Sequence, residues 1–100
     1  MKLTNAEIKS IRKYFSDKPI LRAYVFGSYA RGDADEKSDV DLLVELDYTK
    51  KIGLQYVRMQ LDLEKILHKR IDFSSEGFLK PRIEKAIQAE KQLVYEKSVG

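Results

Sequence analysis

Hydrophobic and polar positions change their spacing several times along the chain, and each change marks an expected element. Near the amino terminus, Thr4 and Glu7 have the spacing of a capping box, and the apolar residues after them recur at helical intervals as far as Pro19. Residues 20–26, ILRAYVF, are β-branched and aromatic, which favours a strand that stops at Gly27. The chain is therefore expected to open with a helix and a strand.

The next pattern is the almost continuous apolar run VDLLVEL at residues 40–46, which is typical of a central strand covered on both faces. Before it, a short helical turn is expected at Tyr29 and Ala30, and residues 32–37, GDADEK, are dense in turn formers and predict an exposed loop. This direct connection allows the two strands to pair in antiparallel fashion.

Helical and extended patterns alternate in the second half of the chain. Apolar residues at helical spacing predict a helix over residues 52–68. Residues 70–74, RIDFS, predict a short strand in which Asp72 points to the face opposite its apolar neighbours Ile71 and Phe73.

A further helix is expected with Pro81 in its first turn, and residues 92–95 predict an edge strand. In this order the elements predict a single domain over residues 1–100. We expect an α/β (α+β) fold, a small mixed β-sheet with helices packed on it.

Composition narrows the possible functions. Nineteen Lys and Arg residues against sixteen Asp and Glu give a net charge of +3, and the basic residues are scattered, so we expect no direct nucleic-acid binding. The chain has no cysteine, which excludes a disulfide framework, a thiolate metal site and a cysteine nucleophile. Neither a signal-peptide core nor a bilayer-spanning run is visible, so a cytoplasmic protein without membrane association is expected.

Two acidic residues lie at the start of the central apolar strand, where an unpaired carboxylate is costly. Asp39 and Asp41 are two residues apart, which in an extended chain sends both side chains to one face, about 6 to 7 Å apart at the backbone. Their repulsion becomes binding when a divalent cation such as Mg²⁺ lies between them. With Asp72 as a third oxygen donor, the acids are sufficient for two metal ions about 4 Å apart, as phosphoryl-transfer enzymes use.

A phosphate held by such a metal also needs contacts of its own. Gly27 and Ser28 follow the first strand, where a missing side chain lets backbone N–H groups approach an oxyanion and a hydroxyl adds a donor. Arg31 follows closely enough to contact a phosphate. We therefore predict a phosphate site at these three residues, next to the acidic pair.

Taken singly, these residues also have purely structural explanations. An isolated D-x-D caps a loop or pairs with basic residues, a Gly-Ser dipeptide is a common turn, and a lone arginine is usually solvated. The oxygen-rich stretch from Asp33 is not an EF-hand loop, because its sixth residue is Ser38 instead of glycine and its twelfth is Val44 instead of glutamate. His68 is interpreted as the polar end of a helix. The combination, rather than any single residue, favours a functional site.

Gly27 and Ser28, ten intervening residues and then D-V-D on an apolar strand resemble the signature of the polymerase-beta-like nucleotidyltransferase superfamily. The longer string GSYARGDADEKSDVDLLVEL, residues 27–46, is similar to its smallest branch, the minimal nucleotidyltransferases or MntA-type (MNT) antitoxins. The similarity extends over nearly all of the chain. One departure is that family members often carry a glycine shortly before the third acid, whereas this chain has HKRID at residues 68–72.

The resemblance implies the polymerase-beta-like nucleotidyltransferase fold. It also implies a reaction in which a hydroxyl attacks the α-phosphate of ATP and pyrophosphate leaves. Gly27 and Ser28 would hold the triphosphate, and Asp39 and Asp41 would bind Mg²⁺. Asp72 would complete the metal site and help to deprotonate the attacking hydroxyl.

In the family that the chain resembles, the acceptor is a tyrosine of a HEPN-domain toxin encoded beside the antitoxin. Building the sheet and its helices uses the 100 residues, so the acceptor is expected to come in trans. We therefore expect a Mg²⁺-dependent protein adenylyltransferase that acts as an antitoxin. The alternatives are an antitoxin that neutralises the toxin by binding alone, and nucleotidyl transfer to a small molecule or a nucleic acid.

Overall fold

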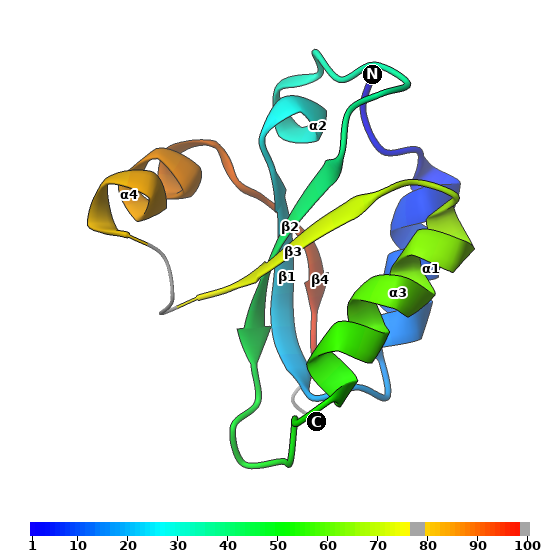
Figure 1. Cartoon of the computed structure of the whole chain (residues 1–100), viewed down its shortest axis with the longest axis vertical. Helices are drawn as coiled ribbons and strands as arrows, with labels where there is room; N and C mark the ends of the chain where they lie inside the picture. Colours follow the sequence, from blue (N-terminus) through cyan, green and yellow to red (C-terminus); the bar gives the residue numbers. More distant parts are fainter. Residues whose placement is uncertain (77–79, 99–100) are drawn as a thin grey trace.

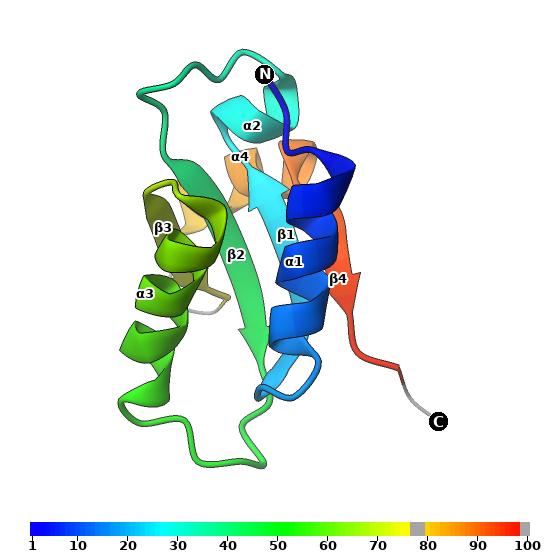
Figure 2. The same cartoon turned by 90° about the vertical axis from the view of Figure 1, so that its right-hand side faces the viewer.

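Four β-strands form one sheet in the computed structural model (Figure 1), which describes residues 1–76 and 80–98. The elements in chain order are α1 (Asn5–Phe15), β1 (Ile20–Phe26), α2 (Ser28–Arg31), β2 (Val40–Leu46), α3 (Gln55–Leu67), β3 (Ile71–Ser75), α4 (Pro81–Glu90) and β4 (Gln92–Glu96). The strand order is β3-β2-β1-β4, as Figure 2 shows. The pair β2–β3 is parallel and the other two pairs are antiparallel. The predicted mixed sheet, with 40–46 in its interior and the last strand at an edge, is confirmed.

The main core lies between the sheet and the two long helices α1 and α3, which cover the same face (Figures 1 and 2). Every second residue of β2 points into it, and the set Val40, Leu42, Val44 and Leu46 is buried. α1 contributes Ile11 and Phe15, and α3 contributes Met59, Leu63 and Leu67. Because this face takes the even-numbered residues of β2, its odd-numbered residues, including Asp41, point to the other face.

Helix α4 lies on that other face and is much less deeply packed (Figure 1). Ile87 is its one buried residue. Leu43 is also fully buried, yet it lies outside the main core cluster, on the α4 side of the sheet. The carboxyl end of α4 therefore lies over the same face as Asp41 with little apolar anchoring.

Strand β3 is an edge strand whose outward backbone groups are bonded by side chains of α3. Tyr56 Oη donates to the Phe73 carbonyl at 3.1 Å, and Gln60 Nε2 donates to the Ile71 carbonyl at 3.0 Å. The Ile71 N–H donates to Glu64 Oε2 at 3.1 Å. These α3 residues are spaced four apart, so one face of the helix replaces a neighbouring strand and holds the backbone on both sides of Asp72.

The turn from α3 to β3 contains the departure from the family pattern. His68 is the C-cap of α3 and adopts the left-handed conformation, with φ 55° and ψ 39°. This conformation is easy for glycine and costs about 1 to 2 kcal/mol for other residues. The interpretation of His68 as the end of a helix is confirmed, and the residue bears a backbone strain that a glycine at this point avoids.

None of the helices within residues 1–76 and 80–98 has the length and apolar character that a membrane crossing requires.

Replacing His68 by glycine should stabilise the fold. Relief of the left-handed strain outweighs the greater freedom of glycine in the unfolded chain, so we expect His68→Gly to raise the free energy of unfolding by about 0.5 to 1 kcal/mol and Tm by about 3 to 6 °C. Thermal and urea denaturation measure both quantities. The matched control is His68→Ala, which removes the imidazole but keeps the Cβ and should give no gain. An equal or lower Tm for the glycine variant would contradict the assignment of strain.

Candidate active site

The three predicted acids lie at one end of the sheet, and two of them are direct neighbours. Asp41 and Asp72 are each the second residue of their strand, and the parallel register of β2 and β3 pairs them. Both residues stand between core-facing neighbours, so both side chains project from the face opposite the main core. The structure thus brings together two acids that are 31 positions apart in the chain.

The proximity of these carboxyl groups changes the protonation of one of them. Burial raises the pKa of Asp41 to about 6, with further contributions from the negative charge of Asp72, a hydrogen bond with that side chain and the charge of Asp39. Arg31 opposes the rise. A partly buried carboxyl group whose charge is unfavourable is a typical feature of a site that binds a cation.

Asp39 lies just before β2 and makes a different contact. Its Oδ1 forms an ion pair with Arg70 Nε at 3.2 Å. The side chain of Asp39 is 49% exposed and that of Arg70 is 76% exposed. Such exposed pairs contribute about 0 to 1 kcal/mol and exchange easily. Within the described ranges 1–76 and 80–98, no group of three or more His, Cys, Asp or Glu side chains is arranged to hold a metal ion. Joint ligation by all three acids therefore stays a prediction.

Gly27 ends β1 next to Asp41, because Phe26 and Asp41 are register partners. Its backbone has φ 69° and ψ −149°, a conformation that only glycine adopts readily. A Cβ at this position would overlap Asp41 Oδ2. A glycine is thus required here on two counts, and its absent side chain lets the turn backbone lie directly against the acidic pair.

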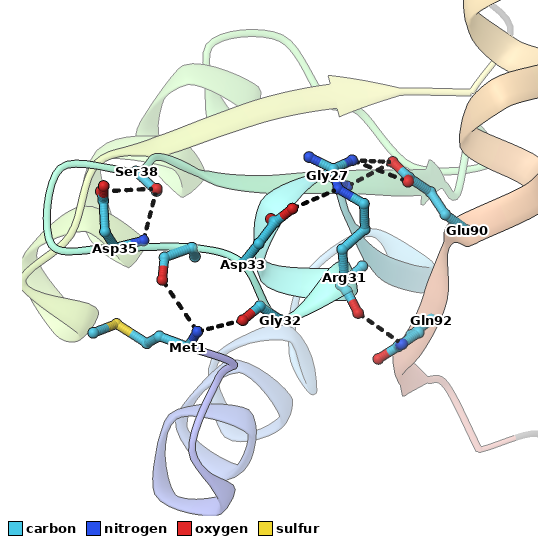
Figure 3. A network of polar contacts seen from close by, with 11 residues as sticks. Met1, Gly27, Arg31, Gly32, Asp33, Asp35, Ser38, Glu90 and Gln92 are labelled. Atoms are coloured by element: carbon cyan, nitrogen blue, oxygen red, sulfur yellow. Dashed lines mark hydrogen bonds and ion pairs between the residues drawn. The ribbon is translucent and has the colours of Figure 1, made fainter.

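Helix α2 follows this turn and carries Ser28 and Arg31. Gly27 is its N-cap, and the left-handed Gly32 ends it by donating its N–H to the Ser28 carbonyl at 2.9 Å. The Met1 ammonium group ties down the loop that follows, with bonds of 2.6 Å to the Gly32 carbonyl and 3.1 Å to the Ala34 carbonyl. Figure 3 shows the contacts of Met1 together with the Arg31 side chain.

The groups predicted to hold phosphate are engaged with a residue that the sequence analysis did not identify. The Gly27 N–H donates to Glu90 Oε1 at 2.9 Å, and Arg31 Nη1 donates to the two Glu90 oxygens at 3.3 and 3.1 Å. Arg31 Nε also pairs with Asp33 at 3.2 Å (Figure 3). Two of the three predicted phosphate ligands therefore converge on one anion, which is a carboxylate of the chain itself.

No local pattern points to Glu90, which lies 63 positions from Gly27. It approaches the turn because Gln92, at the start of β4, is the register partner of Val25 near the end of β1. The side chain of Gln92 also donates to the Ala30 carbonyl at 3.1 Å. Only knowledge of the β1–β4 pairing reveals this contact.

The donor chemistry fits a divalent cation. Mg²⁺ is usually bound by one or two carboxylates together with substrate phosphates, and Asp41 and Asp72 supply two adjacent carboxyl groups on one face. Burial and the neighbouring carboxyl groups raise the pKa of Asp41, so the charged form of this side chain is stabilised by a nearby cation. Asp39 is close enough to influence Asp41, and it joins such a site only by leaving Arg70.

Removal of the Asp72 charge should lower the pKa of Asp41 from about 6, though not to its usual value, because burial remains. The folded protein keeps the proton on Asp41 up to about pH 6, whereas the unfolded chain releases it at about pH 4. The free energy of unfolding therefore falls as pH rises through this window. In Asp72→Asn we expect a shallower fall and, after allowance for solvent screening, about 1 kcal/mol more stability at pH 7.

Carboxyl NMR titration and urea denaturation between pH 4 and 8, without divalent cations, measure these effects. The exposed loop variant Glu36→Gln is the control and should leave both the Asp41 pKa and the slope unchanged. If Asp72→Asn left the Asp41 titration where it is in the wild type, the electrostatic coupling of the two acids would be disproved.

This chain is similar to several known proteins. The family model described as nucleotidyltransferase domain matches residues 8–94. The protein adenylyltransferase MntA of Thermococcus cleftensis is 35% identical over 88 residues, which span 88% of this chain and 85% of that protein. The solved structure of a candidate minimal nucleotidyltransferase is 36% identical and superposes with a TM-score of 0.75, over 87% of this chain and 88% of that one.

A more distant structure is the complex of the tri-AMPylated HEPN toxin of Shewanella oneidensis with an MNT antitoxin. It superposes with a TM-score of 0.69 at 14% identity, over 95% of this chain and 74% of that one, and at this identity it shows the fold alone. Together with the match over residues 8–94, these similarities confirm the expected fold and the predicted resemblance to minimal nucleotidyltransferases. The chain belongs to the nucleotidyltransferase domain family, as a minimal member homologous to MntA-type protein adenylyltransferases.

Proposed function

We propose that this protein transfers AMP from ATP to a tyrosine hydroxyl of a partner HEPN-domain toxin and thereby acts as its antitoxin. The observation that carries the proposal is the Asp41–Asp72 pair, held side by side by the β2–β3 register against the glycine turn at the end of β1. The family match and the likeness to MntA support nucleotidyl transfer to protein. The toxin as acceptor is supported by the solved complex of an AMPylated HEPN toxin with an MNT antitoxin.

In this proposal Asp41 and Asp72 hold Mg²⁺, with Asp39 as a further ligand. The bound ion supplies charge neutralisation and Lewis acidity at the phosphoryl oxygens. The Gly27 N–H, the Ser28 hydroxyl and the Arg31 guanidinium bind and orient the triphosphate, as donors beside the acidic pair. Orienting the α-phosphate in line with the incoming hydroxyl is the main contribution that such a site makes.

The proposed reaction forms one bond and breaks another. The tyrosine oxygen bonds to the α-phosphorus, and the bond from that phosphorus to the oxygen bridging to the β-phosphate breaks. Asp72 helps to take the tyrosine proton, while pyrophosphate leaves with the bonding electrons. A carboxylate with this role has to lie at the open face of the sheet, and Asp72 is exposed.

A second function, neutralisation of the toxin by binding alone, needs no acidic pair. The β2–β3 register nevertheless places the carboxyl groups of Asp41 and Asp72 side by side, a repulsion that a simple binding surface has no reason to contain. This repulsion favours catalysis. Transfer to a small molecule uses the same groups and differs only in the acceptor.

Asp41→Asn should reduce AMP transfer to the co-purified partner toxin by about a hundredfold or more, because it removes a carboxylate from the metal and phosphate site. The measurement is incorporation of label from α-labelled ATP with Mg²⁺, followed by mass spectrometry of the modified tyrosine. Asp17→Asn, which removes an exposed aspartate beyond α1, is the control and should retain wild-type transfer.

Other outcomes separate the alternatives. If the double variant Asp39→Asn plus Asp41→Asn neutralised the toxin as fully as the wild type does, binding alone would be the mechanism of neutralisation. Turnover of a small hydroxyl compound at the same rate with and without toxin would point to a small-molecule acceptor.

A further inference from the structure

The carboxylate of Glu90 occupies the place where the proposed function puts a phosphate. It accepts from the Gly27 N–H at 2.9 Å and from Arg31 Nη1 at 3.1 Å. Backbone N–H and guanidinium donors that converge on one anion form the contact set that binds a phosphate oxygen. Figure 3 shows the Glu90 side chain reaching from α4 to Arg31.

The position of Glu90 within its helix is unfavourable for a carboxylate. It is the last residue of α4, and the last turn of this helix contains no basic residue. A negative charge there faces the negative end of the helix dipole. The contacts with Gly27 and Arg31 offset this repulsion, so helix stability alone does not account for the acid at this position.

The contact is also of a kind that exchanges readily. The Glu90 and Arg31 side chains are 30% and 51% exposed, so water screens their attraction. The β1–β4 pairing holds Gln92, two residues further on, so the Glu90 carboxylate leaves the corner by rotation of its own side chain and the helix need not move. A nucleotide triphosphate carries several negative charges and competes well for the same donors.

We propose that Glu90 is an intramolecular occupant of the phosphate-binding corner made by Gly27 and Arg31, and that it leaves this corner when a nucleoside triphosphate binds. The inference rests on the proposed function, which places the triphosphate at this corner. It adds an autoinhibitory contact. The position of Glu90 and the occupancy of the nucleotide site are thereby coupled. A contact or ligand that holds Glu90 in place weakens nucleotide binding by some factor, and bound nucleotide weakens that contact or ligand by the same factor.

The test compares the affinity of the full chain for AMP-PNP with Mg²⁺, measured by isothermal titration calorimetry, in wild type and in Glu90→Gln. The amide keeps the shape of the side chain but removes its charge, so Kd should fall about three- to tenfold. The matched control is Asp33→Asn, which removes an equal charge from the other contact of Arg31 and leaves the Gly27 N–H engaged. It should change Kd less than about twofold.

An unchanged or higher Kd for Glu90→Gln, with measurable binding, would overturn the autoinhibitory contact and leave the proposed function intact. An equal gain from Asp33→Asn would also overturn it, because the effect would then be one of general charge. Absence of AMP-PNP binding in both wild type and Glu90→Gln would overturn the proposed function, and this inference with it.

A second measurement uses the unmodified chain, so it holds even if a variant fails to fold. The side-chain carboxyl ¹³C resonance of Glu90 should move to the position of a solvent-exposed glutamate when AMP-PNP and Mg²⁺ saturate the protein. A resonance that stays in place at saturation would show that Glu90 and the nucleotide do not compete.

Discussion

The repulsion between Asp41 and Asp72 is the constraint around which the site is built. The parallel register of β2 and β3 places the two carboxyl groups side by side, and the partial burial of Asp41 limits the screening of their repulsion by water. Burial, together with this repulsion, raises the pKa of Asp41 to about 6, so in acidic solution a proton on Asp41 relieves part of the repulsion. At neutral pH the two carboxyl groups repel each other, which is a typical feature of a cation-binding site.

A pair that repels itself has to be held by the surrounding fold. β2 is anchored because its even-numbered residues are buried under α1 and α3. β3 is an edge strand, and α3 secures it through Tyr56 and Gln60, which bond the carbonyls on both sides of Asp72. The same helix therefore packs against the core and fixes the backbone around Asp72. The stability of the core thus offsets the repulsion between Asp41 and Asp72.

The parts of this structure that follow from local pattern were predictable from the sequence. The strand 40–46 has a hydrophobic run that suits only an interior strand, and Asp72 alternates with two apolar neighbours, which fixes its face. The parts that depend on distant pairing were not predictable. The contact of Glu90 with Gly27 exists only because β4 returns beside β1, and no spacing rule places Arg70 on Asp39.

The distribution of charge around the site suggests why those unpredicted contacts matter. Two cationic side chains at the site are already paired with carboxylates. Arg31 pairs with Glu90 and Asp33, and Arg70 pairs with Asp39. These pairs are exposed and individually weak, whereas the Asp41–Asp72 repulsion is partly buried and harder to screen. A bound cation with a polyphosphate therefore neutralises the repulsion between Asp41 and Asp72, and it replaces only the weak, exposed ion pairs around them. In the proposed function, nucleotide binding is then a redistribution of existing charges, in which Arg31 exchanges its carboxylate partners for phosphates.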